Sequence, residues 1–485
     1  MELSIAAIIG VVTFVGDIVV KVLAVIYVPR NRRPQTALAW LLAIFLLPYV
    51  GIALYLLAGN WLLPKKRREK QATINALIKR TTDSIDTRDI EPLDLPDWLA
   101  PITTLNRSLG ALPIVGGNSA VVYRTDSSGL AAMIAEIDAA TVAVHAEFYI
   151  MSLDSTSAPF FDALERARAR GVTVRVLFDH LGSRSYPGYS PMKRRLRAMG
   201  VRWHFMLPFF PLRGQIQRPD LRNHRKLLVI DGTVAFTGSR NIIDPGYQKR
   251  GNVHRHLRWH DFMVRFEGPV VAEIEAVFIS DWYSETDELL EDFEVTEIEL
   301  AGDLECQVVP SGPGFDGENN LRLFNSLVYS ARKRIVLTSP YFVPDDSMLY
   351  AITTAAQSGI EVELFVSEVG DQFLVYHAQR SYYEQLLKAG VRIWLYEKPV
   401  VLHAKHFTID DELSVFGSSN MDMRSFTLDL EITVMVRGAS FHDELTATQE
   451  EYRTHSRELT LDEWSKRGFL TRTLDDLARL TAAVQ

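Results

Sequence analysis

The sequence predicts an α/β protein with two pseudo-twofold-related halves, each a mixed β-sheet flanked by helices, preceded by an N-terminal membrane helical hairpin. Two apolar stretches predict the hairpin, and a repeated strand–helix pattern with a repeated motif predicts the halves. A chain of 485 residues exceeds what one core usually serves, so several domains are expected. The expected parts are a hairpin over 1–62, a linker over 63–110, a first half over 111–297, and a second half with a C-terminal helix over 298–485.

The predicted hairpin consists of residues 5–28 and 36–58, each long enough to cross a bilayer as a helix. A second apolar stretch so soon after the first argues against a cleaved signal peptide. Asp17 and Lys21 are four residues apart and can pair on one helix face. Charges inside a bilayer are costly, so this face is expected to pack on the second helix or on another subunit. Pro48 makes a kinked or re-entrant second helix the alternative to a straight span.

Basic residues near the hairpin indicate its orientation, because cytoplasmic flanks are rich in lysine and arginine. If both helices span, the larger cluster after the second helix places the rest of the chain in the cytoplasm. If both helices re-enter, both clusters are cytoplasmic. The two clusters are Arg30, Arg32 and Arg33 in the loop, and Lys65, Lys66, Arg67, Arg68 and Lys70 after the second helix.

Composition limits the kinds of function that this chain can have. A net charge of −8 argues against a nucleic-acid partner, because such proteins usually carry a basic surplus. The single cysteine, Cys306, can form no intramolecular disulfide and no multi-cysteine zinc site. The histidines show no metal-binding pair at helical spacing. We therefore expect no metal and no cofactor.

The chain after residue 110 contains one pattern of elements twice. A strand is expected at 142–150 and again at 335–343, followed by helices at 160–170 and 348–357. Second strands are expected at 172–178 and 360–366, and second helices at 192–199 and 375–389. Glycines stand where these helices need a C-terminal stop. Alternating strands and helices are typical of an α/β fold with parallel strand pairs.

Each copy ends in the same motif, H-x-K-x-x-x-x-D. In the first copy it comprises His224, Lys226 and Asp231, and in the second it comprises His403, Lys405 and Asp410. Glycine, serine and asparagine follow at equal spacing in both copies, as Gly238, Ser239 and Asn241 and as Gly417, Ser418 and Asn420. Two copies with the same downstream residues do not arise by chance, so the signal is strong.

These residue types suit the exchange of a phosphodiester. In a strand, the histidine and lysine of H-x-K project from the same face. Two such motifs around one point allow one imidazole to attack phosphorus while the other protonates the leaving alkoxide. The lysines, with Asn241, Asn420, Ser239 and Ser418, are expected to bind the phosphate oxygens. Asp231 and Asp410 complete the motifs, and we expect them to hold backbone at a turn.

Each histidine also needs an orienting acceptor on its other ring nitrogen. Asp261 follows His224 by 37 residues and Glu431 follows His403 by 28, and we predict that these carboxylates orient the histidines. Two further sets have two interpretations each. Aromatic residues at strand ends line a lipid pocket or pack in the core, and arginines before the first motif steer anionic head groups or form a solvated face; the sets are Tyr149, Tyr341 and Phe342, and Arg213, Arg218, Arg222 and Arg225.

The paired motifs with their G-S-x-N segments resemble the phospholipase D superfamily. Several other segments are similar to bacterial cardiolipin synthases, and this match spans nearly the whole chain. They are the apolar hairpin, Pro-Tyr-Phe-Val-Pro-Asp at 340–345, Arg-Ser-Tyr-Tyr at 380–383, Trp-His-Asp at 259–261 and Glu-Gly-Pro at 267–269.

The resemblance implies a phosphatidyltransferase that converts two phosphatidylglycerols into cardiolipin and glycerol through a phosphohistidine intermediate. It implies His224 as the nucleophile and His403 as the general acid and base, although the near-symmetry of the copies leaves the reverse open. It also implies a multi-pass protein of the bacterial inner membrane with cytoplasmic catalytic domains. The expected partners are phospholipids, the bilayer and a second copy in a homodimer. Phosphatidylethanolamine as second substrate, phospholipase D hydrolysis, a nuclease and a non-catalytic tether are the alternatives.

Overall fold

The computed structural model describes residues 5–30, 34–59, 67–74, 76, 93–210, 218–290, 299–315 and 317–482. The chain forms two compact units. One comprises residues 1–62 with 218–220, and the other comprises residues 63–217 with 221–485. Of the residues in the predictions above, Arg32, Arg33, Lys65, Lys66 and Arg213 lie outside the described residues.

The N-terminal unit contains three helices, α1 (Ile5–Tyr27), α2 (Pro34–Leu46) and α3 (Pro48–Ala58). Among the described residues, α1 alone is long and apolar enough to cross a membrane, over Gly10–Tyr27. The second apolar stretch is divided at Leu47, whose backbone is not helical, and Pro48 begins the next helix without an N–H to donate. The structure therefore has the kinked alternative and not one straight second span.

The charged pair of α1 lies on the side that meets α2. Lys21 Nζ donates to Asp17 at 2.7 Å and lies 5.8 Å from the centroid of the Phe45 ring. One turn further along, Ala24 is buried in a small apolar cluster that includes Ile44 of α2. The predicted packing of this face on the second apolar stretch is thus found in the described residues, and it places the Lys21 ammonium beside the Phe45 ring.

The second unit contains the two predicted halves. The elements of the first half are β1 (Ile114–Tyr123), α6 (Asp126–Ala139), β2 (Ala143–Phe148), α7 (Ala158–Ala169), β3 (Thr173–Asp179), α8 (His180–Arg184), α9 (Tyr189–Ala198), β4 (Arg202–Met206), β5 (Lys226–Ile230), β6 (Val234–Gly238), α10 (Arg250–His254), β7 (Arg258–His260), β8 (Met263–Glu267) and α11 (Val270–Thr286). The predicted strands and helices of this copy agree with β2, α7, β3 and α9 within about three residues at each end.

The second half repeats this order and then adds a C-terminal part. Its elements are β9 (Leu304–Ser311), α12 (Asn319–Ser330), β10 (Arg334–Thr338), β11 (Phe342–Val343), α13 (Asp346–Gln357), β12 (Glu361–Ser367), α14 (Phe373–Ala389), β13 (Arg392–Tyr396), β14 (Val400–Leu402), β15 (His406–Ile409), β16 (Leu413–Gly417), β17 (Met421–Asp422), α15 (Met423–Thr427), β18 (Glu431–Arg437), α16 (Ala439–Thr454), β19 (Ser456–Leu459), α17 (Leu461–Ser465) and α18 (Phe469–Arg479).

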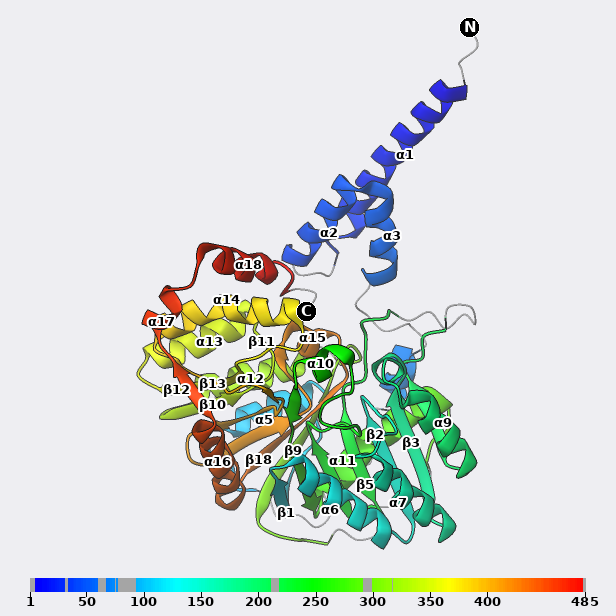
Figure 1. The fold of residues 1–485 in the computed structure, drawn as a ribbon, viewed down its shortest axis with the longest axis vertical. Coiled ribbons are helices and arrows are strands. Elements are labelled where there is room, and N and C mark those ends of the chain that lie inside the picture. Colours follow the sequence, from blue (N-terminus) through cyan, green and yellow to red (C-terminus); the bar gives the residue numbers. More distant parts are fainter. Residues whose placement is uncertain are drawn as a thin grey trace. The chain divides into compact units, whose positions relative to one another are not determined.

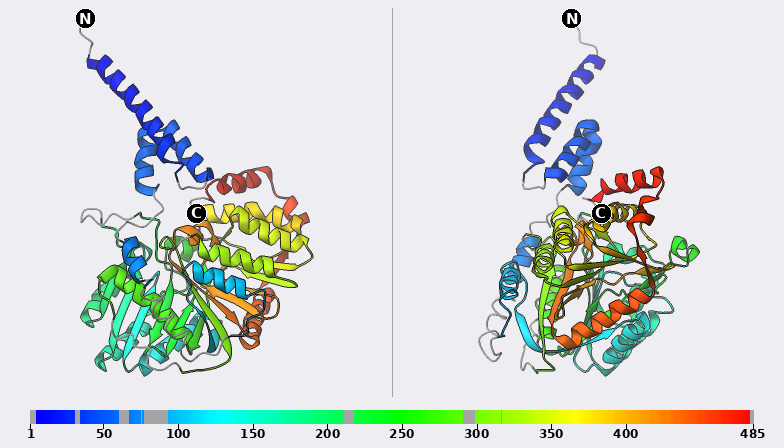
Figure 2. Two further views of the ribbon diagram at one scale, coloured as in Figure 1. Left: turned by 180° about the vertical axis from the view of Figure 1, so that it is seen from behind. Right: turned by 90° about the vertical axis from the view of Figure 1, so that its left-hand side faces the viewer.

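Both halves belong to one continuous mixed sheet. Its strand order is β19-β13-β12-β10-β15-β16-β18-β9-β1-β8-β6-β5-β2-β3-β4, so the order on one side of the β9–β1 junction mirrors the order on the other. Strands β2, β3 and β4 are parallel, as are β10, β12 and β13, while β1 and β9 pair antiparallel. Figures 1 and 2 show the two halves side by side, with helices over both faces.

The described part of the predicted linker belongs to the second unit and packs against its two halves. Residues 67–74 are helical, and Arg67 forms a bidentate pair with Glu285 of α11, both contacts at 2.7 Å. Helix α5 (Ala100–Ser108) contributes Asn106, whose amide donates to Gln307 of β9 at 2.8 Å. These contacts fasten the segment to both halves.

Two equivalent glycines lie where strands approach too closely for a side chain. A Cβ at Gly417 would lie 2.1 Å from the Ile432 carbonyl oxygen, and one at Gly238 would lie 2.5 Å from that of Phe262. The serines that follow donate their backbone N–H to the same two carbonyls, at 2.9 and 3.0 Å. The glycines therefore set the positions of Ser418 and Ser239.

We expect Gly417→Ala to lower the free energy of unfolding by roughly 1–3 kcal/mol, because the added methyl meets backbone that cannot move aside. Chemical denaturation of the full chain in detergent measures this loss. Gly251→Ala is the matched control, since nothing lies within 4 Å of a Cβ there. Equal stability of the two variants would contradict the close-approach explanation.

Candidate active site

Each motif enters the site beside a segment of the other half. The backbone N–H of His224 donates to the Leu430 carbonyl at 2.8 Å, and Asn223 forms an isolated parallel bridge with Leu430. In the second copy, β14 pairs in parallel with β7, and the N–H of His403 donates to the His260 carbonyl at 2.8 Å. The residue after each of these two carbonyls is a predicted orienting carboxylate.

The orienting carboxylates are exchanged between the halves. His224 Nδ1 lies 3.0 and 3.1 Å from the carboxylate oxygens of Glu431, and His403 Nδ1 lies 2.6 Å from Asp261 Oδ1. The structure thus places Asp261 and Glu431 against the histidines. The partner of each is the histidine of the opposite copy, which spacing along the chain did not indicate.

The two serines lie behind these carboxylates. Ser239 Oγ donates to Asp261 at 2.6 Å, and Ser418 Oγ donates to Glu431. Their hydroxyl hydrogens are therefore directed to the carboxylates, and the predicted contact of these serines with phosphate oxygens stays a prediction. Ser425 gives Glu431 a second hydroxyl donor at 2.8 Å. Sequence reasoning missed this residue, because it follows the G-S-x-N segment and is not part of it.

Both motif lysines are buried and turn toward the backbone of their own histidine. Lys226 Nζ donates to the carbonyl of His224, and Lys405 Nζ donates to that of His403. An ammonium group has three N–H donors, so each lysine keeps donors for a substrate. Burial lowers the pKa of Lys226 to about 8 and that of Lys405 to about 7. Lys226 also lies 5.3 Å from the centroid of the Tyr149 ring.

The first pair favours an uncharged imidazole. Burial lowers the pKa of His224 well below its ordinary value, and the charges of Lys226, Lys405 and His403 lower it further. Burial also raises the pKa of Glu431 to about 7, even though Lys226 opposes this shift. The influence of His403 and Lys405 on His224 shows that the two motifs share one electrostatic environment.

The second pair differs, because its carboxylate stays ionised. Burial alone would raise the pKa of Asp261, but the charge and hydrogen bond of His403, together with Lys405 and Ser239, bring it below its usual range. Burial lowers the pKa of His403, and the charge of Asp261 opposes that shift. Of the two imidazoles, His403 therefore has the partner better able to retain a proton on the ring.

The two predicted asparagines are not equivalent in their contacts. The side chain of Asn241 is tied at both ends, since Oδ1 accepts from the Ile150 N–H at 3.0 Å and Nδ2 donates to the Tyr247 hydroxyl at 2.8 Å. Asn420 Oδ1 is buried with no hydrogen-bond partner among the described residues. Asn420 thus has a side-chain group that faces no described partner.

The motif aspartates lie at the far ends of β5 and β15. Asp231 accepts backbone N–H groups from residues 141–143 at 2.7–2.8 Å, and Asp410 accepts those of residues 332–334 at 2.7–3.2 Å. Both have positive φ, near 52° and 53°, at the turn that follows the strand. Their carboxylates hold the ends of adjacent strands and do not contact the histidines.

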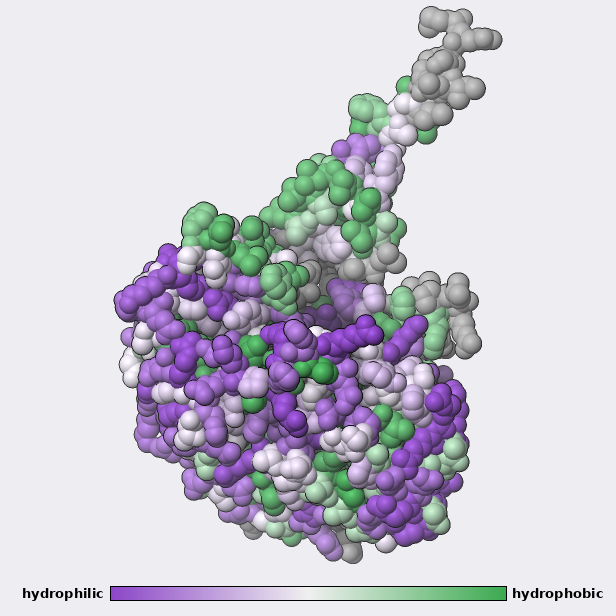
Figure 3. All heavy atoms as spheres, viewed as in Figure 1, coloured by the Kyte–Doolittle hydropathy of each residue, from purple (hydrophilic) through white to green (hydrophobic). Residues whose placement is uncertain are grey.

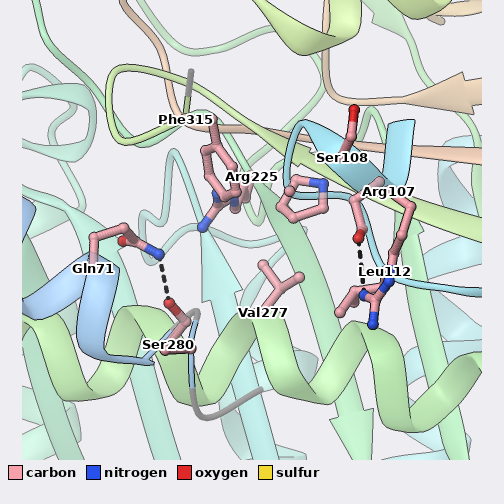
Figure 4. Close-up of a pocket in the computed structure, with 12 residues that line it drawn as sticks. Gln71, Arg107, Ser108, Leu112, Arg225, Val277, Ser280 and Phe315 are labelled. Carbon is pink, nitrogen blue, oxygen red and sulfur yellow. Dashed lines mark hydrogen bonds between the residues drawn. The ribbon is translucent and has the colours of Figure 1, made fainter. Parts of the chain in front are cut away.

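Two of the four arginines near the first motif, Arg222 and Arg225, are buried and paired with carboxylates. Arg225 is buried, pairs with Asp281 and donates to the Glu431 carbonyl at 3.0 Å. Arg222 is also buried and lies 3.2 Å from Asp179. Arg225 also lines a cavity of about 230 Å³ together with Gln71 and Phe315 (Figure 4). Arg222 and Arg225 therefore do not form a solvated face.

Two aromatic rings border the histidines. The Tyr149 ring centroid lies 4.8 Å from that of His224, and the Tyr341 centroid lies 6.4 Å from that of His403. Phe342, in contrast, is fully buried in the core of the second half. The tyrosines therefore belong to the surroundings of the site, and the phenylalanine to the core.

Comparison with known proteins agrees with this geometry. A family model described as "Cardiolipin synthase, PLD-like domain" matches residues 133–282 and 325–452, and one described as "Phospholipase D-nuclease N-terminal" matches residues 19–60. Cardiolipin synthase A of Proteus mirabilis (strain HI4320) is 36% identical and that of Serratia proteamaculans (strain 568) is 34% identical, each over 92% of both chains.

A solved structure shares the fold at low sequence identity. The phosphatidylserine synthase of Haemophilus influenzae Rd KW20 is 14% identical, with a TM-score of 0.59 over 81% of this chain and 100% of its own. The family models cover the strands that carry both motifs, and the curated relatives cover nearly all of the chain. This chain belongs to the cardiolipin synthase family of the phospholipase D superfamily.

Proposed function

We propose that this protein transfers a phosphatidyl group from one phosphatidylglycerol to the head-group hydroxyl of another, releasing glycerol, through a phosphohistidine on His224. One observation carries the proposal. Each imidazole has its Nδ1 occupied by a buried carboxylate, which leaves Nε2 as the nitrogen that can meet substrate. One site thus offers two imidazoles that can act in sequence.

The first step forms the covalent intermediate. The Nε2 lone pair of neutral His224 attacks phosphorus, and the bond between phosphorus and the glycerol oxygen breaks. A proton on His403 Nε2 passes to that oxygen, so glycerol leaves as a neutral alcohol. The unlike carboxylates support these roles, because burial leaves His224 uncharged while ionised Asp261 favours the proton on His403.

The second step regenerates the enzyme. The head-group hydroxyl of a second phosphatidylglycerol gives its proton to His403 and attacks phosphorus, and the bond to His224 breaks. The product is cardiolipin, and both imidazoles return to their starting states. Lys226 and Lys405 stabilise the negative charge on the non-bridging oxygens in both steps. With water as acceptor, the same site would make phosphatidic acid.

The proposed location follows from the N-terminal unit and the substrates. The apolar helix α1 and the lipid substrates of the family support membrane association. We propose the bacterial inner membrane, with the catalytic halves in the cytoplasm, because the described part of the basic segment after the hairpin includes Arg67, Arg68 and Lys70. The net charge of −8 argues against nucleic acid as the substrate.

Replacement of either histidine by alanine is expected to reduce cardiolipin formation by on the order of 10²–10⁴-fold, because each performs an essential transfer. The assay supplies phosphatidylglycerol in vesicles and separates cardiolipin and glycerol from phosphatidic acid. His254→Ala, an exposed histidine in α10, is the control that should retain activity. A wild-type protein that makes only phosphatidic acid would refute the synthase activity.

Radioactive phosphate in the lipid head group should identify the nucleophile. In the His403→Ala variant the covalent intermediate has lost its general base, so label is expected to accumulate on His224. Acid-labile label is located by rapid quenching and peptide mapping at alkaline pH. Label on His403 in the His224→Ala variant would instead reverse the two roles.

The charge of Lys405 should set the alkaline limit of activity. Its pKa is lowered to about 7, so the cation is present below that pH and is lost as pH rises. We expect kcat/KM to fall by up to about tenfold per pH unit above this value. Lys405→Arg stays charged and should move the fall upward by at least about one unit, whatever its absolute activity. Lys333→Arg, at an exposed lysine, is the control, and an unmoved profile in Lys405→Arg would exclude this role.

A further inference from the structure

The C-terminal helix α18 has its apolar face turned away from the protein. Phe469 and Leu470 are 79% and 81% exposed, and Leu477 and Leu480 are 57% and 79% exposed. The face toward the protein carries Asp475, which is 1% exposed. Helices on globular proteins normally bury the apolar stripe and expose the charged one, so the orientation of α18 is the reverse of the usual one.

Polar contacts fix this orientation. Asp475 lies 2.7 Å from His377 Nδ1 and 3.4 Å from Arg380 Nε, both on α14, and it pairs with Arg467. Rotating α18 to bury its leucines would remove this carboxylate from three cationic or protonatable partners. The outward direction of the leucines is therefore part of the fold, and a covering surface has to come from outside these contacts.

The beginning of α14 extends the same surface. Phe373 and Leu374 are 64% and 50% exposed, and α14 and α18 lie side by side (Figures 1 and 2). Hydrophobic side chains gather over α18 in Figure 3. We define the apolar patch as Phe373, Leu374, Phe469, Leu470, Leu474, Leu477 and Leu480. Exposed apolar surface of this extent, rimmed by polar residues, marks a contact with another molecule or a membrane.

A cation-lined cavity adjoins the apolar patch. Its volume is about 630 Å³, and Phe373 of the patch and Trp464 form part of its wall. Three carboxylates line it, those of Glu368, Asp371 and Glu463, against five cationic side chains, those of Arg255, Arg380, Lys398, Arg457 and Arg467. Asp475, which pairs with Arg380 and Arg467, brings the carboxylates around these cations to four. In a chain of net charge −8, the remaining excess of one positive charge is complementary to lipid phosphates.

We infer that the apolar patch and its cavity form a membrane-docking surface that rests on an anionic bilayer. The leucines and phenylalanines enter between the acyl chains, and the cations meet the phosphates, as in amphipathic helices at membrane interfaces. This inference rests on the proposed function only in that both require a phospholipid bilayer. The bilayer is favoured over a second copy of the chain because apolar and cationic groups occur together.

The surface is connected to the active site through one residue. Asp371 on the cavity wall accepts hydrogen bonds from the Tyr341 hydroxyl at 2.9 and 3.0 Å. The ring of Tyr341 lies beside that of His403. The cavity wall is thus linked to the surroundings of His403 by one hydrogen-bonded tyrosine.

Site-directed fluorescence in the full-length protein tests the inference. Leu477→Cys and the control Asp476→Cys, at an exposed polar position of the same helix, are labelled with an environment-sensitive maleimide dye. The natural Cys306 is buried, and the unsubstituted protein gives the background labelling. The proteins are reconstituted in vesicles of phosphatidylcholine and phosphatidylglycerol, with nitroxide-bearing lipid or aqueous iodide as quencher.

The label at 477 should lose most of its fluorescence to the nitroxide lipid and little to iodide, and the label at 476 should show the reverse preference. Strong quenching of the 477 label by iodide would show a water-exposed helix and overturn the inference. Protection from both quenchers would show that protein covers the patch, from a second copy or another segment, and would also overturn it. The readout needs no catalysis, so failure of the proposed activity leaves it interpretable.

Activity provides a second measurement. The Leu470→Glu, Leu477→Glu double variant should lose cardiolipin formation on vesicles and retain it when substrate is supplied in detergent micelles, which require no docking. Equal loss in both systems would overturn the role of the patch as a bilayer contact. A denaturation curve matching that of the parent protein confirms that the variant is folded before the comparison is made.

Discussion

The hydrogen bonds that cross between the two halves are the constraint on which the site depends. Strands β1 and β9 make one sheet of both halves, and His224 and His403 bind backbone carbonyls next to the carboxylates of the opposite half. Neither half alone could orient its own histidine. Separation would also remove the imidazole partners of Asp261 and Glu431, which are buried in the assembled structure. Assembly of the fold and assembly of the site are therefore the same event.

Duplication would by itself give two equal imidazoles, but the reaction needs unequal ones. A nucleophile must keep a free lone pair, and a general acid must keep a proton. The carboxylates supply the difference, since Glu431 has a pKa raised to about 7 by burial and Asp261 stays ionised beside His403. Two titratable groups whose environments separate their pKa values identify acid and base roles. The two histidines are the same residue type, and the difference between their roles comes from their carboxylate partners.

The strands and helices of the repeat were predicted closely from the sequence. The periodicity of apolar residues and the glycines that end helices are local properties of the chain. Because the motif occurs twice, the sequence predicted that His224 and His403 share one site. It also predicted Asp261 and Glu431 as the orienting carboxylates, because a histidine of this kind needs an acceptor on its other ring nitrogen. It could not pair them correctly, because spacing along one copy says nothing about a strand from the other. For Ser239 and Ser418, residue type allowed phosphate or carboxylate as acceptor, and only the fold decides. The interruption of the second apolar helix before Pro48 was one of the two predicted alternatives, because proline has no N–H to donate within a helix.

The two motif lysines are positively charged when substrate is bound, yet their burial without substrate costs less free energy than two permanent charges would. Lys226 and Lys405 are fully buried, and burial brings their pKa values to about 8 and about 7. Near neutral pH, part of the population can release the proton of Lys405 when no phosphate is bound, which limits the free energy of holding a buried charge. A phosphodiester between the lysines favours their charged forms. Binding therefore couples to proton uptake, and the cations are most fully formed when the phosphate whose transition state they stabilise is present.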